Sequence, residues 1–265
     1  MTFFKATSTR ILSAGLLISL ALPGLCAQDL AGNITYQQVL HYSFENIQQA
    51  HGNDARTQDW IAALPQKGIT VQVLSFNSRK ALFTEDDSEK EATPPGLQRA
   101  LMYENSLKPP RPLIQKVFFD FEKSQMLEQV EYLTRLFLVK SDMEALAWKL
   151  GGEKKKILEY TCMGATVILD EQEIKAWFAP EIPVSLGPSV YGGLPGLILA
   201  VERNGETAYV ATSVDLTPPA EGSLEKPDKG NKVGLEEFES IQEEKEKEWR
   251  ENSQRGRSQG ENFHR

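Results

Sequence analysis

Cys162 and the three histidines are the side chains of this sequence whose chemistry would be easiest to recognise in an enzyme. A thiolate acts as a nucleophile when a neighbouring base lowers its pKa. Cys162 lies in an apolar segment typical of a strand, where burial would raise the pKa, and His41 and His51 are distant in sequence. His264 lies near the end of the chain, and the histidines lack metal-binding spacing such as HxxxH. We therefore expect a structural cysteine and no metal site.

Carboxylates offer a second kind of chemistry. Glu171 and Glu173 could supply an acid and a base for sugar hydrolysis, but neighbouring acids beside a turn are usually solvated. The acidic residues 85–89 lack the glycine turn and the regular spacing of a calcium loop. The sequence contains neither a phosphate-binding glycine loop nor a GxSxG nucleophile motif. We expect no cofactor, and a hydrolase without a recognisable motif is kept as an alternative.

The most distinctive segment is 176–201, AWFAPEIPVSLGPSVYGGLPGLILAV, in which six of the ten residues 187–196 are Gly or Pro. Glycine permits unusual backbone angles and proline fixes them, so the segment should follow one specified path. The predicted structural motif consists of Gly187, Pro188, Gly192, Gly193 and Gly196. Its alternative role is a groove for an apolar ligand, a peptide or an envelope protein. The candidate ligand-binding residues are Trp177, Tyr191, Leu194 and Pro195.

The elements that would hold this segment are mostly strands. Alternating apolar and polar residues predict short strands, which lie at 33–44, 69–76, 80–84, 114–121, 129–133, 134–139, 156–169 and 207–216. Asn204-Gly205 is typical of a hairpin turn. The predicted class is α+β, mainly β: a curved antiparallel meander sheet with peripheral helices and a C-terminal helix. We assign residues 28–216 to this domain.

The N-terminus predicts export. Lys5 and Arg10 precede an apolar run at 11–22, which is typical of a signal peptide, here residues 1–27. Lipidation at Cys26 is disfavoured because Leu25 occupies the position where that signal requires a small residue. We therefore expect a periplasmic or secreted protein without stable membrane insertion. The formal net charge of -8 also argues against nucleic acid as a partner.

The C-terminal part changes in character after residue 216. Three prolines predict a linker at 217–234, and residues 235–250 predict a charged amphipathic helix. Its narrow, mainly apolar stripe would either dock on the domain or bind a partner, and it consists of Leu235, Phe238, Ile241, Lys245 and Trp249. Residues 251–265 are polar, and we expect them to be disordered.

The phrase GGLPGLIL at 192–199 resembles the signature of the GLPGLI family of exported Bacteroidetes proteins. Five other phrases of this sequence stand in the order expected for the family, so the resemblance extends over residues 32–250. They are GNITYQQ, SFNSRKALF, FLVKSD, KKILEYTCMGA and EEFESIQEEK. Glu159 and Met163-Gly164 depart from the usual GYxCxKA phrase. The resemblance implies an envelope protein with no assigned reaction. Together with the residue analysis it favours a non-catalytic binding or chaperone-like protein, with a hydrolase or an interaction component using the C-terminal helix as alternatives.

Overall fold

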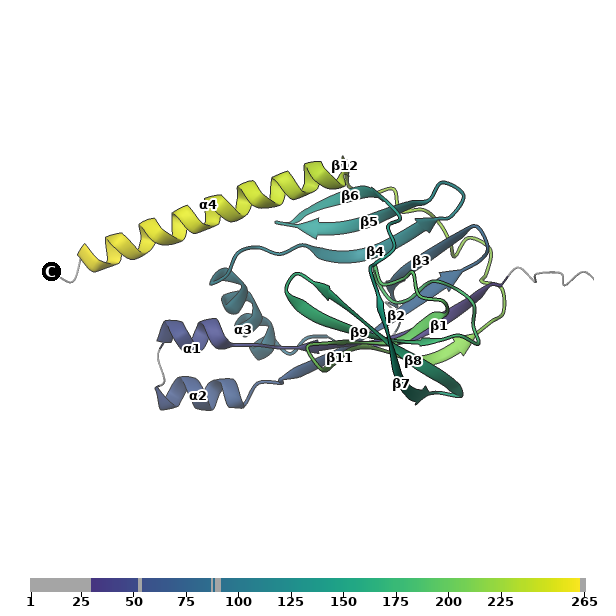
Figure 1. Ribbon diagram of the computed structural model, residues 1–265. Helices are drawn as coiled ribbons and strands as arrows, with labels where there is room; N and C mark the ends of the chain where they lie inside the picture. Colours follow the sequence, from purple (N-terminus) through teal and green to yellow (C-terminus); the bar gives the residue numbers. More distant parts are fainter. Residues whose placement is uncertain (1–29, 52–53, 87, 89–91, 263–265) are drawn as a thin grey trace, which may run out of the picture.

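The computed structural model describes residues 30–262, except for residues 52–53, 87 and 89–91. The predicted signal peptide lies outside the described residues. Within them the chain forms one 12-stranded sheet and four helices (Figure 1). The predicted class, α+β and mainly β with a large antiparallel sheet, is confirmed.

The sheet consists of two meanders joined through the first strand. In sheet order the strands are β12 (Asn231–Gly234), β6 (Arg135–Asp142), β5 (Gln125–Tyr132), β4 (Leu113–Asp120), β3 (Lys80–Glu85), β2 (Lys67–Phe76), β1 (Gly32–His41), β11 (Glu206–Asp215), β10 (Leu197–Arg203), β9 (Gln172–Ala179), β8 (Tyr160–Leu169) and β7 (Lys149–Ile157). Every neighbouring pair is antiparallel except β12 and β6, which are parallel. Because β1 pairs with both β2 and β11, the N-terminal strand holds the two halves together.

Tight turns explain why consecutive strands become neighbours. Asn204 and Gly205 both have positive φ, 49° and 80°, and they connect β10 to β11 as predicted. Positive φ at both central residues is the geometry of the type I′ turn, whose twist matches that of the strands. Positive φ at both residues also occurs in two other turns, Leu133-Thr134 and Asp170-Glu171. Of these four residues only Asp170 is of a type that favours positive φ. Turn geometry is thus imposed partly by the strands on either side.

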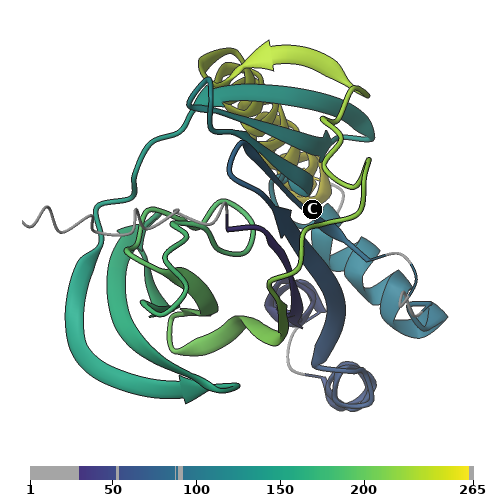
Figure 2. The ribbon, with the colours of Figure 1, turned by 90° about the vertical axis from the view of Figure 1, so that its right-hand side faces the viewer.

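The sheet is strongly curved, and its two ends face each other across several loops (Figure 2). The main core lies on the inner side, where β1 to β4 contribute alternate apolar residues such as Tyr36, Phe83 and Val117. The Gly- and Pro-rich loop packs against them through Leu186, Tyr191 and Leu194. The other face of β3 to β6 is covered by a small cluster around Leu224, which belongs to the segment that precedes β12.

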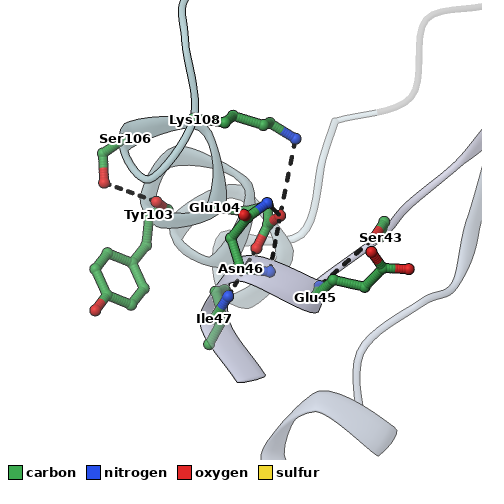
Figure 3. Close-up of polar contacts among 8 residues, drawn as sticks. All are labelled: Ser43, Glu45, Asn46, Ile47, Tyr103, Glu104, Ser106 and Lys108. Carbon is green, nitrogen blue, oxygen red and sulfur yellow. Dashed lines mark hydrogen bonds and ion pairs between the residues drawn. The ribbon is translucent and has the colours of Figure 1, made fainter. Parts of the chain in front are cut away.

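Three helices form an appendage with its own core (Figure 1). They are α1 (Glu45–His51), α2 (Ala55–Ala62) and α3 (Pro95–Ser106). The buried carboxylate of Glu104 on α3 accepts hydrogen bonds from the backbone N–H of Ile47, at 3.0 Å, and from the side-chain amide of Asn46, at 2.6 Å. Lys108 lies 3.9 Å from the same carboxylate (Figure 3). Glu104 therefore satisfies amide groups at the start of α1, which would otherwise have no partner.

The C-terminal part differs from the expectation in two ways. The segment predicted as a linker contains β12, because its residues 231–234 add a parallel strand to β6. The final helix, α4 (Leu235–Asn262), continues 12 residues beyond the predicted end at 250, through residues expected to be disordered. Composition gives little signal for this extension, because half of residues 251–262 are Glu, Gln and Arg, which have good helix propensity, and the other half are Asn, Ser and Gly, which do not.

The beginning of α4 is docked on its own domain. The ring of Phe238 is buried and lies 5.9 Å from the ring of Tyr132 and 5.3 Å from that of Phe137. The helix then extends past the sheet (Figure 1). In the part of the chain that the structure describes, no helix combines the length and the apolar character needed to cross a membrane.

Candidate functional site

The Gly- and Pro-rich loop is tied to the sheet by backbone hydrogen bonds. The amide of Leu197 donates to the carbonyl of Ile182 at 2.9 Å, and that of Gly193 donates to Ser185 at 3.1 Å. A Cβ added to Gly196 would lie 2.4 Å from the carbonyl oxygen of Ala179, so only glycine fits there. The loop therefore follows one specified path between β9 and β10, as its sequence indicates.

The four predicted ligand-binding residues do not come together in a cavity. Tyr191 and Leu194 are buried in the main core, and Pro195 is exposed. Trp177 is also buried and makes contacts of its own on β9. Their role in ligand binding stays a prediction, whereas the structure gives three of them a role in packing.

Trp177 is enclosed by charged side chains. The ammonium groups of Lys155 and Lys175 lie 5.3 and 4.7 Å from the centre of its indole ring. Its Nε1–H donates a hydrogen bond of 2.9 Å to Glu202, which also accepts from Lys155 at 3.1 Å. The indole thus has both a polar partner and cation–π partners within the protein.

A large groove lies elsewhere, against the C-terminal half of β6. It has a volume of about 1440 Å³, more than the roughly 300–1,000 Å³ of pockets that enclose drug-sized ligands. Apolar side chains from β4, β5, the segment after β6 and the Gly- and Pro-rich loop form much of its wall, namely Phe119, Met126, Met143, Leu146, Leu186 and Val190. Gly192 and Gly193 of the predicted structural motif also line it. The space is suited to an extended ligand with apolar and polar parts.

Glu128 is the acidic group on the inner wall of this groove. It lies on β5 directly opposite Val117 of β4 and Val139 of β6, both of which are fully buried. Met126 and Val130 are its neighbours along the same face of β5. A half-buried carboxyl group is thus surrounded by apolar side chains on an otherwise apolar face.

This environment changes the acidity of Glu128. Burial raises its pKa above the ordinary value of 4.5, because the charged form loses hydration. Hydrogen bonds have the opposite effect on several other carboxyl groups, whose pKa values they lower: Asp54, Asp86, Asp120 and Asp215. A carboxyl group with a raised pKa inside an open groove keeps its proton to a higher pH than an exposed glutamate does, which suits it to proton transfer.

The rim of the groove is strongly charged. It carries five exposed carboxylates, which are Asp142, Glu144, Asp228, Glu236 and Glu237, and three exposed lysines, which are Lys140, Lys226 and Lys232. Glu236 and Glu237 belong to the first turn of α4, so the docked helix forms one border of the site. The mixture of signs favours a polar neutral ligand over a strongly charged one.

The cysteine chemistry considered from the sequence has no support in the structure. The side chain of Cys162 is fully buried, and burial raises its pKa to about 11, with a further increase from Glu181. A thiol in this state is a poor nucleophile at neutral pH. His41 contacts Glu206 and the carbonyl of Thr207, and His51 contacts Tyr103. Within the described residues no group of three His, Cys, Asp or Glu side chains is placed to hold a metal ion.

Glu128 was not among the predicted site residues, because the strand was expected to begin at Gln129. The structure starts β5 at Gln125, which places Met126, Glu128, Val130 and Tyr132 in one inward-facing row. One sequence signal could have identified Glu128: it is the single acidic residue among apolar residues that recur at every second position. Such an interruption is uncommon on a buried face and indicates either a partner or a function.

One family model matches the part of the chain that contains most of the groove. Residues 114–233 match a family model described as "N-glycanase peptide, N-terminal domain". All the groove residues named above except Glu236 and Glu237 lie within this range. A search of curated proteins finds no significant match.

Two solved structures share the fold. The "Structure of PNGF-II in P21 space group" is 17% identical, has a TM-score of 0.50 and covers 80% of this chain. The "Structure of PNGF-II in C2 space group" is 16% identical, has a TM-score of 0.51 and also covers 80%. This chain spans only about a third of those proteins, 33% and 32% respectively.

These comparisons correct one expectation and refine another. The predicted non-catalytic binding or chaperone-like function is contradicted, because the family match is to a domain of an N-glycanase. The family model that matches is that of the N-glycanase N-terminal domain, and not that of the GLPGLI family suggested by the phrase GGLPGLIL.

Proposed function

We propose that this chain takes part in the hydrolysis of N-glycan linkages, with the groove as the substrate site and Glu128 as the group that transfers a proton. The observation that carries this proposal is the half-buried carboxyl group of Glu128, opposite Val117 and Val139, in an open groove. The family match supports the substrate class, because it covers the inner wall of the groove.

The proposed chemistry needs one acid whose proton is available near neutral pH. Glu128 in its acid form donates a proton to the leaving atom while water adds to the other side of the broken bond. The resulting carboxylate then takes up the proton that the attacking water loses, so Glu128 returns to its starting form. Burial among apolar side chains keeps a larger share of the acid form than an exposed glutamate would have.

The dimensions and charges of the groove agree with a glycosylated polypeptide as substrate. Its apolar wall offers contacts for sugar faces and side chains, and its rim offers hydrogen-bonding groups of both signs. The match to this chain covers only 33% and 32% of the PNGF-II structures, so the proposal concerns the part of the reaction that the groove performs.

The proposal includes export of the protein. The basic residues Lys5 and Arg10 and the apolar run at 11–22 support a signal peptide, which would deliver the chain to the periplasm or the exterior. The phrase GGLPGLIL supports a GLPGLI-type protein of the Bacteroidetes. Glycoprotein substrates would be accessible in either compartment.

The experiment compares three proteins on an N-glycosylated peptide, with products detected by mass spectrometry. The parent chain should release the glycan, and E128Q should do so at least about 100-fold more slowly. E173Q is the matched control, since Glu173 is an exposed strand glutamate outside the groove, and it should keep the parental rate. Equal rates for the parent and E128Q, or no release by the parent, would contradict the proposal.

A further inference from the structure

Ser141 has an unsatisfied hydroxyl group at the groove. Its Oγ is buried and has no hydrogen-bond partner, a property shared among the described residues only with the hydroxyl of Tyr132. Tyr132 packs under Phe238 of α4 and does not line the groove, whereas Ser141 does. A buried hydroxyl without a partner is destabilising, and it requires an explanation in a folded protein.

The strand register places Ser141 beside Glu128. Ser141 pairs with Met126, and Glu128 pairs with Val139, so the two polar residues are diagonal neighbours on the same inward face of β5 and β6. Diagonal neighbours in an antiparallel pair are about 7–8 Å apart. The carboxyl group of Glu128 also has no hydrogen-bond partner among the described residues. Two polar groups without a hydrogen-bond partner in the described residues thus lie on the same face of adjacent strands.

We propose that Glu128 and Ser141 form a two-point subsite that binds one hydroxyl or acetamido group of a sugar between them. A ligand atom in this position can lie about 2.8 Å from each side chain, which is ordinary hydrogen-bond geometry. Both side chains can donate as well as accept, so the subsite matches a neutral group that also does both. This inference rests on the proposed function, for which it makes Ser141 a positioning residue and the sugar group the part of the substrate that is recognised.

The test measures binding of a peptide that carries N-acetylglucosamine on asparagine, by isothermal titration calorimetry. S141A should weaken binding about fivefold to tenfold, the usual effect of losing one hydrogen bond. S213A is the matched control, because Ser213 is an exposed strand serine outside the groove, and its affinity should stay within twofold of the parent. In the E128Q background the further effect of S141A should shrink to less than twofold, because both groups hold the same ligand group.

Folding is checked by a second measurement. S141A removes an unsatisfied buried hydroxyl, so its melting temperature should equal or exceed that of the parent. Parental affinity in S141A, or no binding by the parent at millimolar peptide, would overturn the inference. Weakened binding in S141A without glycan release by the parent would leave the subsite standing and overturn only the hydrolytic role. Glycan release by the parent together with unchanged affinity in S141A would leave the hydrolytic role standing and overturn only the subsite.

Discussion

The indole Nε1–H of Trp148 donates a hydrogen bond of 2.8 Å to the carbonyl oxygen of Gly192. Trp148 lies just before β7, in the segment that crosses from β6 to the opposite edge of the sheet, and Gly192 lies in the Gly- and Pro-rich loop. The contact therefore joins the crossover to the loop that forms part of the groove wall. It shows how a segment without regular structure is held in place.

Trp148→Phe should remove this hydrogen bond and keep most of the ring packing. We expect a loss of about 1 kcal/mol in the free energy of unfolding, measured by urea denaturation. The carbonyl of Gly192 would then lose its partner, so the neighbouring amides should exchange hydrogen faster. An unfolding free energy equal to that of the parent would show that the contact has no structural weight.

Gly196→Val should destabilise the protein by about 3 kcal/mol, because its Cβ would meet the backbone of Ala179. Gly193→Val should cost about 1–2 kcal/mol through its φ of 85° alone, since the nearest atom is 3.5 Å away. Gly152→Val is the control, because its added Cβ would have no atom within 4 Å. Melting temperatures of the two loop variants within a degree of the parent would refute this explanation.

Glu104→Ala should destabilise the helical appendage. The substitution leaves the amides at the start of α1 without their acceptor, and we expect a loss of about 2–3 kcal/mol. Hydrogen exchange should accelerate in α1 and α3, while the strands of the main sheet keep their protection. Exchange that increases uniformly over the sheet would contradict the view that the appendage is a separate cluster.

Glu128 should make stability depend on pH. Its pKa in the folded state is raised, so its stabilising contribution is present below the ordinary value of 4.5 and is lost as the pH rises through the folded-state pKa. E128Q cannot ionise, and it should therefore gain stability relative to the parent as the pH rises from 4.5 through the folded-state pKa of Glu128. E173Q should follow the parent over this range in urea denaturation. A constant difference between E128Q and the parent would exclude the raised pKa.

Much of the fold can be predicted from patterns among residues that are close together in the sequence. Alternating residues located most strands, and Asn204-Gly205 located one hairpin. The predicted strand at 156–169 is instead two strands, because Leu158 adopts a positive φ of 53° that a leucine does not signal. β12 was missed because four residues are too few to show a period and its parallel partner is distant in sequence.

The site was harder to predict than the fold. The loop between β9 and β10 is rich in aromatic and aliphatic residues, which suggested a binding surface, but the curved sheet buries Trp177, Tyr191 and Leu194. Glu128 and Ser141 come together only through the register of β5 and β6. A single sequence does not specify which side chains of neighbouring strands are diagonal partners.

The most direct test of the central claim is the rate of glycan release from an N-glycosylated peptide as a function of pH. If Glu128 acts as the acid, the parent should lose activity as the pH rises through the raised pKa of this residue, and E128Q should be nearly inactive at every pH. Glycan release by E128Q with the parental rate and pH profile would show that the reaction does not use Glu128.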